Sequence, residues 1–223
     1  MPNWSKNKVT IVGPQADIDA FAWKARGYRP RFKLSEMEHR YAMGKEPEEE
    51  APMEEFSFHA LIPIAAETLA QTYDPAGIDA ERALWSLKWG ACDPAKPVRV
   101  SPTELLYEFD TAWTPPFAFL LRVSASFPSL SFLCSFAEEY PTRGYAIFAH
   151  GGIRCRVDES SNDDPAYPEF DEEQDREDPT YDARHHESSQ AWRFKYHADH
   201  AAMVARYVGS SPDISITENG IFD

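Results

Sequence analysis

The chain has few cysteines and no long apolar segment. Cys92, Cys134 and Cys155 form an odd set without close pairing or metal-ligand spacing, which argues against a disulfide framework and favours buried thiols in a reducing compartment. No segment approaches the ~20 apolar residues of a transmembrane helix. Residues 1–7 also lack the apolar core of a signal peptide. We therefore expect a cytoplasmic protein.

Motifs that mark common enzyme classes are also missing. The sequence has no P-loop, no Gly-x-Ser-x-Gly elbow, no His-Glu-x-x-His pair and no dinucleotide-binding glycine fingerprint. No nucleophile with an evident base can be named. We therefore assign no catalytic residue, no cofactor and no metal ligand, and the sequence favours a non-enzymatic function.

Basic residues are scarce relative to acidic ones. The 223 residues include 22 Lys and Arg against 37 Asp and Glu, a net charge of −15. The excess lies in two stretches: the first acidic block, residues 46–55, has six acids and no base, and the second acidic block, residues 158–182, has twelve acids and one base. Such a chain repels a phosphate backbone, so direct nucleic-acid binding is disfavoured.

Hydrophobic periodicity predicts an α+β domain with a ferredoxin-like sheet. Apolar residues alternate in four strands, at 8–12, 56–62, 105–111 and 130–137, followed by a hairpin of 145–149 with 153–157. Helical spacing recurs at 18–25, 79–89 and 115–127, and Gly27 is expected to end the first helix in a left-handed conformation. This order is the split βαβ arrangement. Because right-handed crossovers leave both helices on one sheet face, the other face must be covered or must serve for binding, and the insertions 28–55 and 64–97 are the candidates to cover it.

The octet Phe109-Asp110-Thr111-Ala112-Trp113-Thr114-Pro115-Pro116 predicts a strand that runs into a helix. Thr114 is expected to cap that helix and Pro115 to occupy its first turn, where the missing N–H is harmless. Trp113 is expected to lock the corner between the two elements.

Three motifs carry a resemblance to a known family. They are the octet above, the start Met1-Pro2-Asn3-Trp4, and Trp85-Ser86-Leu87-Lys88-Trp89-Gly90-Ala91-Cys92-Asp93. Together they resemble the YubB-like family, over about residues 1 to 157. The family start has cysteine where Ser5 stands, and its middle motif has Gly-Thr in place of Ser86-Leu87. The resemblance implies a ferredoxin-like domain carried by bacteriophages and plasmids, with no defined biochemical role.

The C-terminal third is predicted to be an appendage. Residues 1–157 would form the ferredoxin-like domain, 158–189 an acidic linker with the composition of a solvated segment, and 190–223 a helix near 190–208 and a short strand. Trp192, Tyr196, His200, Met203 and Tyr207 share one stripe of that helix.

The acidic blocks are the leading candidate site. Concentrated carboxylates steer association with a cationic partner. Together with the resemblance to a family carried by bacteriophages and plasmids, these acidic blocks suggest a counter-defence or host-takeover protein. Such a protein would bind and inhibit a basic, nucleic-acid-handling host protein. The candidate contact residues are eight acids and two aromatic anchors: Glu48, Glu49, Glu50, Tyr167, Phe170, Asp171, Glu172, Glu173, Asp175 and Glu177. The alternative interpretation is a solvated surface that maintains solubility.

Two other functions stay open. A metal-dependent hydrolase would use the C-terminal histidines, His185, His186, His197 and His200, although His200 shares the apolar stripe and is better explained as a packed histidine. A self-assembling structural protein would use an uncovered sheet face or edge. The tryptophans at 4, 85, 89 and 113 are interpreted as core anchors rather than base-stacking residues, as are Tyr107 and Phe109.

Overall fold

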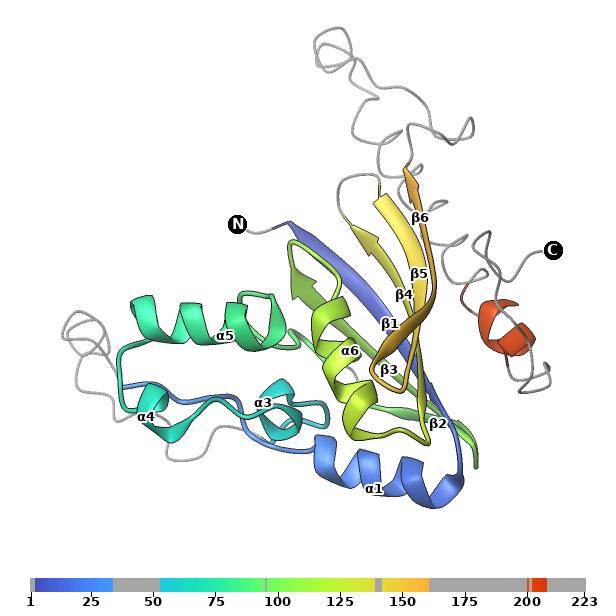
Figure 1. Cartoon of the computed structure of the whole chain (residues 1–223), viewed down its shortest axis with the longest axis horizontal. Helices are drawn as coiled ribbons and strands as arrows, with labels where there is room; N and C mark the ends of the chain where they lie inside the picture. The colour runs from blue at the N-terminus through green and yellow to red at the C-terminus, as the bar shows by residue number, and fades with distance from the viewer. Residues whose placement is uncertain are drawn as a thin grey trace, which may run out of the picture.

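The structure is a computed structural model that describes residues 3–33, 53–94, 96–138, 142–160, 200 and 202–207. Its elements follow the order of Figure 1. The strands are β1 (Trp4–Val12), β2 (Val98–Ser101), β3 (Glu104–Ala112), β4 (Ser131–Glu138), β5 (Thr142–Ala149) and β6 (Gly152–Ser160). The helices are α1 (Gln15–Ala25), α3 (Phe58–Leu61), α4 (Ala66–Leu69), an irregular turn η1 (Tyr73–Gly77), α5 (Ile78–Trp85) and α6 (Phe117–Ser126).

The six strands form one antiparallel sheet in the order β2-β3-β1-β4-β5-β6. The first four reproduce the ferredoxin-like pattern, because each crossover passes over one strand: β1 to β2 skips β3, and β3 to β4 skips β1. The β5–β6 hairpin extends this sheet on the β4 side. The fold class predicted from the sequence is thus confirmed.

Alternation along the strands places the core on one face of the sheet. In β3, Leu105, Tyr107 and Phe109 are buried, and they face the same cluster as Val9 and Ile11 of β1. Helices α1 and α6 cover this face, with Phe21 and Phe119 fully buried. Figure 1 shows both helices on the same side of the sheet.

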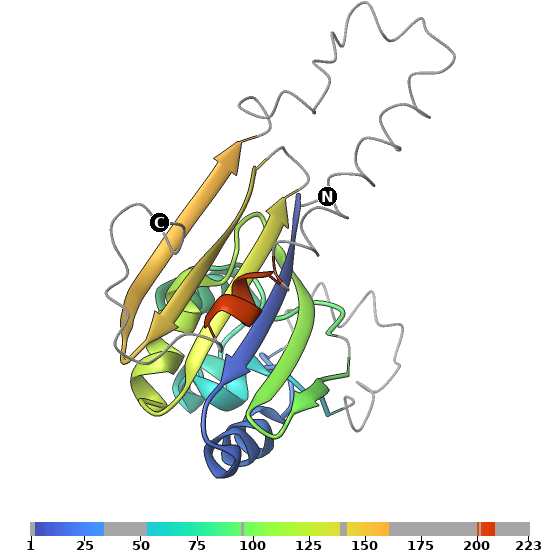
Figure 2. The ribbon, with the colours of Figure 1, turned by 90° about the vertical axis from the view of Figure 1, so that its right-hand side faces the viewer.

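A short C-terminal segment covers part of the opposite face. Met203 is 1% exposed and belongs to a second apolar cluster with Leu133 of β4, Ile147 of β5 and Cys155 of β6. Residues 202–207 are helical, and Figure 2 shows this turn in front of the strands, with the other helices behind them. The prediction of a helix near 190–208 is confirmed over these residues.

The second strand lies elsewhere than predicted. The alternation of Phe56 and Phe58 resembles a strand, but the Ser57 hydroxyl accepts a hydrogen bond from the Ala60 N–H at 3.2 Å and starts helix α3. The true second strand is β2, at 98–101. Its valines are more than half exposed at the sheet edge, so no buried face revealed it. The residues between α1 and β2 therefore form one continuous insertion.

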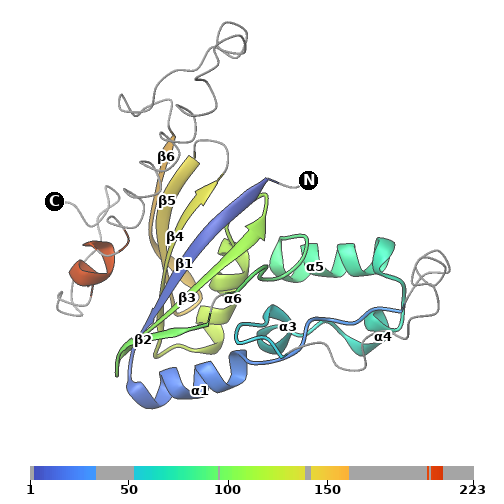
Figure 3. The ribbon, with the colours of Figure 1, turned by 180° about the vertical axis from the view of Figure 1, so that it is seen from behind.

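This insertion packs on the helical side of the sheet, not on the other face as expected. Phe56, Phe58 and Trp85 belong to the same apolar cluster as α1 and α6, and the rings of Phe58 and Phe119 stack at 3.6 Å. Figure 3 shows α3, α4 and α5 on that side.

Four local expectations at element ends are wrong. After α1 the chain leaves through an extended Arg26, and Gly27 has no positive φ. Helix α6 begins at Phe117 after Pro116, with no side-chain cap from Thr114. Trp113 occupies a left-handed turn at φ 68° and is 46% exposed, so it does not lock the corner from inside. Strand β6 continues to Ser160, past the predicted boundary at 157.

Candidate functional site

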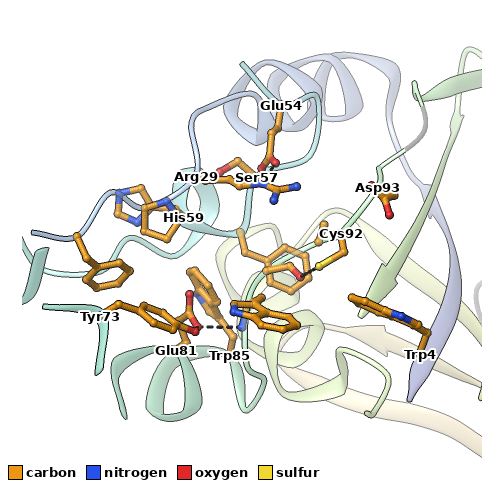
Figure 4. Close-up of a pocket in the computed structure, with 16 residues that line it drawn as sticks. Trp4, Arg29, Glu54, Ser57, His59, Tyr73, Glu81, Trp85, Cys92 and Asp93 are labelled. Carbon is orange, nitrogen blue, oxygen red and sulfur yellow. Dashed lines mark hydrogen bonds and ion pairs between the residues drawn. The ribbon is translucent and has the colours of Figure 1, made fainter. Parts of the chain in front are cut away.

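A cavity of about 580 Å³ lies beside the sheet, within the range of small-molecule pockets. The insertion between α1 and β2 builds almost all of it, and β1 contributes Trp4 (Figure 4). The lining residues are Trp4, Arg29, Pro30, Phe32, Glu54, Ser57, Phe58, His59, Tyr73, Glu81, Trp85, Trp89, Gly90, Ala91, Cys92 and Asp93. Two of the three motifs that carry the family resemblance therefore meet at this cavity.

Six Phe, Tyr and Trp residues are among those that line the cavity. Trp4 stacks on Trp89 with ring centroids 6.3 Å apart, and Phe32 meets Tyr73 edge-on at 5.2 Å. Trp85 is fully buried, and its indole N–H donates to the Ile62 carbonyl at 3.1 Å. Trp4, Phe32, Tyr73 and Trp89 are partly exposed, and such rings offer flat, polarisable surfaces to a ligand.

Glu81 is the most unusual polar residue of the cavity. It comes from the first turn of α5 and is only 3% exposed. One of its carboxylate oxygens, Oε2, accepts hydrogen bonds from the Tyr73 hydroxyl and the Trp89 backbone N–H, both at 2.8 Å. Within the described residues, no hydrogen bond reaches the other oxygen, Oε1. Figure 4 shows Glu81 between Tyr73 and Trp85 along one wall.

Burial raises the pKa of the Glu81 carboxyl, although the Trp89 N–H, the Tyr73 hydroxyl and the charge of Lys88 act in the opposite direction. Desolvation disfavours the ionised form. A positive charge placed in the cavity would favour the ionised form.

The mouth of the cavity holds a second set of charges. Arg29 donates through Nε to Glu54, and burial raises the pKa of Glu54 against the effect of this partner. The exposed Asp93 lies nearby on the same wall. With Arg29 and Glu54 paired, Glu81 and Asp93 leave the cavity with an excess of carboxylates.

The polar lining also includes Ser57, whose hydroxyl donates to the Tyr28 carbonyl at 2.9 Å. The remaining polar residues, His59 and Cys92, do not resemble a nucleophile and its base. The His59 Nδ1 accepts from the Ile64 N–H at 3.1 Å, and burial lowers the pKa of its imidazole. Burial raises the pKa of the Cys92 thiol, so the reactive thiolate is disfavoured.

The candidate contact residues named from the acidic blocks lie outside the described residues: Glu48, Glu49, Glu50, Tyr167, Phe170, Asp171, Glu172, Glu173, Asp175 and Glu177. At the described ends of the blocks, the acids have internal partners. Glu54 pairs with Arg29, Glu55 pairs with Arg26 at 3.2 Å, and Asp158 pairs with Arg156 at 2.7 Å. These end residues are therefore not part of an open anionic surface.

His200 is a packed histidine, as its place on the apolar stripe indicated. It is 6% exposed; its Nε2 lies 2.9 Å from Thr10 Oγ1, and its Nδ1 lies 2.6 Å from Ser135 Oγ. Both ring nitrogens are therefore engaged. The other histidines of the metal hypothesis, at 185, 186 and 197, lie outside the described residues. Within the described part, no group of three or more His, Cys, Asp or Glu is placed to hold a metal ion.

The prediction of core anchors is confirmed for Trp85, Tyr107 and Phe109, all at most 3% exposed. The prediction is wrong for Trp113, which is 46% exposed. It also did not foresee that Trp4 and Trp89 line a cavity. The only sequence signal for this cavity was the concentration of tryptophans in two rare motifs. Among the described residues, no helix is long and apolar enough to span a membrane.

Comparison with known proteins gives similarity to one kind of domain. The family profile described as "Ferredoxin-like domain in Api92-like protein" matches residues 85–184. The crystal structure of protein Api92 from Yersinia pseudotuberculosis aligns with a TM-score of 0.49 and 12% sequence identity, over 72% of this chain and 99% of that one. No curated protein matches. The chain is thus similar to Api92-like proteins through a ferredoxin-like domain.

Proposed function

We propose that this protein acts by binding: it is a non-enzymatic accessory protein of a bacteriophage or plasmid that engages, and inhibits, a basic nucleic-acid-handling protein in the host cytoplasm. The single observation that carries the binding role is the aromatic cavity, in which a buried carboxylate keeps one oxygen without a hydrogen-bond partner among the described residues. Burial keeps the only thiol of this cavity protonated, which supports recognition rather than nucleophilic chemistry.

The preference for a basic partner rests on charge. The chain carries a net charge of −15, and the acids outside the two blocks nearly balance the bases. Opposite charges accelerate encounter and exclude acidic competitors. Nucleic acid itself is disfavoured because the same charge repels phosphates.

The test compares two variants with equal changes in charge. In the first, Glu48, Glu49 and Glu50 of the first acidic block become Gln; in the second, the exposed acids Glu67, Asp74 and Asp79 become amides. Affinity capture from host extract at ~0.15 M salt is compared with capture at ~1 M, where the screening length falls from ~8 Å to ~3 Å. We expect wild type and the second variant to retain a basic host protein at low salt only, and the first variant to lose it.

Equal retention by both variants, or retention that is insensitive to salt, would contradict the role of the blocks. The same exchange at Asp171, Glu172, Glu173, Asp175 and Glu177 tests the second acidic block. Circular dichroism and thermal unfolding establish that each variant is folded.

The self-assembly alternative gains no support from the described edge at β2. This strand has four residues, shifts register between Arg99 and Ser101, and bonds Arg99 to Asp19 of α1. Short, bulged and charged edges disfavour strand addition. The metal-hydrolase alternative stays a prediction that elemental analysis of the untagged protein would test.

A further inference from the structure

No described donor reaches Oε1 of Glu81, and this oxygen is not fully buried. An acceptor that is open to a cavity can exchange water for a hydrogen bond from a ligand. Here both described donors go to Oε2. Because Glu81 lines the cavity, its Oε1 is the acceptor that a ligand in the cavity would meet.

The surrounding aromatic rings favour a planar donor group. Phe32, Tyr73 and Trp89 line the same space and are partly exposed, so a flat group can reach the carboxylate while stacking on aromatic faces. Trp89 already carries a cation from this chain, since Lys88 Nζ lies 4.8 Å from its ring centroid. These rings are thus placed for cation–π contact.

The charges of the lining residues favour a positively charged ligand. Arg29 and Glu54 pair with each other, and Glu81 and Asp93 are the remaining acids of the lining. A nucleotide would bring phosphates into this excess of carboxylates. A guanidinium is planar, is weakly hydrated compared with an ammonium, and donates from several N–H groups.

We propose that the cavity receives an arginine side chain of the basic partner, with its guanidinium donating to Glu81 Oε1 and lying against the aromatic wall. This inference rests on the proposed function, because it identifies which group of that partner is inserted. It also assigns a role to two motifs of the resemblance, at Trp4 and at residues 85–93, that the acidic blocks do not use.

The probe is a blocked arginine, Nα-acetyl-arginine amide, titrated into the full chain by calorimetry. Its neutral isostere, the matching citrulline derivative, has nearly the same shape without the charge. We expect binding of the arginine probe and no measurable binding of the citrulline probe. Glu81→Gln should weaken the arginine probe by about tenfold or more, because a charge-assisted hydrogen bond is replaced by a neutral one. The matched control Glu67→Gln, at an exposed position on α4, should change nothing.

A second variant guards against misfolding of Glu81→Gln. Phe32→Leu keeps the wall apolar but removes one ring, and it should weaken the arginine probe several-fold. A pH series gives an independent readout, because the probe binds ionised Glu81. Burial raises the pKa of Glu81, with Tyr73 and the Trp89 N–H bonded to its carboxylate and Lys88 nearby acting in the opposite direction. Affinity should therefore be full above this raised pKa and fall as the pH is lowered through it in wild type, and it should stay flat in Glu81→Gln.

The two proposals fail in different ways. If the arginine probe does not bind, or binds no better than the citrulline probe, the cavity assignment is wrong even if block neutralisation abolishes capture. If the probe binds and depends on Glu81 while block neutralisation has no effect on capture, the arginine site stands and the role of the blocks falls.

Discussion

At the residue scale, burial was predictable where it follows a simple period. Tyr107 and Phe109 occupy alternate positions of β3, and both lie in the core. The exposure of Trp89 and Trp113 could not be predicted from such a period. Both residues have positive φ, 70° and 68°, where the turn sets the direction of the side chain. A left-handed tryptophan leaves no local sequence signal, since glycine and asparagine are the residues normally expected there.

Tyr107 gives a test of buried polarity. It is 1% exposed, and its hydroxyl has no hydrogen-bond partner within the described residues. Removing an unsatisfied polar atom relieves a desolvation cost, so Tyr107→Phe should leave the free energy of unfolding unchanged or raise it by up to ~1 kcal/mol. Denaturant unfolding measures this change.

Tyr73→Phe is the matched control for that experiment. It removes the same atom, but here the hydroxyl donates to Glu81 at 2.8 Å, and a loss of about 1–2 kcal/mol is expected. If Tyr107→Phe were as destabilising as Tyr73→Phe, the Tyr107 hydroxyl would have a partner after all.

At the element scale, the sequence predicts those elements that bury one face. Strands β1, β3 and β4, helices α1, α5 and α6 and the final hairpin all show apolar residues with the period of their own structure. Strand β2 was missed because its side chains are exposed, and residues 56–62 were misassigned because two core phenylalanines alternate by coincidence around a helix cap. The cavity joins Trp4 to residues 29–93, a contact between distant segments that no local pattern encodes.

The β5–β6 hairpin depends on a glycine in β5. A Cβ at Gly144 would lie 2.0 Å from the Val157 carbonyl oxygen of the neighbouring strand. Gly144→Ala should therefore force β5 and β6 apart and lower the free energy of unfolding by ~1–3 kcal/mol, the usual cost of overpacking. Hydrogen exchange should be faster in both strands.

Gly152→Ala is the control in the same hairpin. Its Cβ would meet only the Ala149 carbonyl oxygen, at an ordinary 3.6 Å. This variant should unfold within about 0.5 kcal/mol of wild type. Equal stability of the two variants would show that the strands can separate locally without cost.

At the scale of the whole molecule, the sheet is covered on both faces by segments far apart in sequence. The helices and the insertion cover one face, and the segment that includes His200 and Met203 contacts the other. Strand β6 ends at Ser160 and the chain returns to the same sheet at His200. The chain is therefore anchored on the same sheet just before and just after residues 161–199.

Met203 provides the test of this arrangement. It is 1% exposed and packs with Leu133, Ile147 and Cys155, and truncating a buried methionine to alanine typically costs ~2–5 kcal/mol. Because the C-terminal segment has a small interface, the loss should appear as local release rather than global unfolding. Met203→Ala should thus speed limited proteolysis after β6 several-fold while the thermal midpoint of the sheet changes little.

Ala205→Ser, at an exposed position of the same turn, is the control and should be digested at the rate of wild type. Identical digestion of Met203→Ala and wild type would mean that Met203 does not anchor this segment on the sheet.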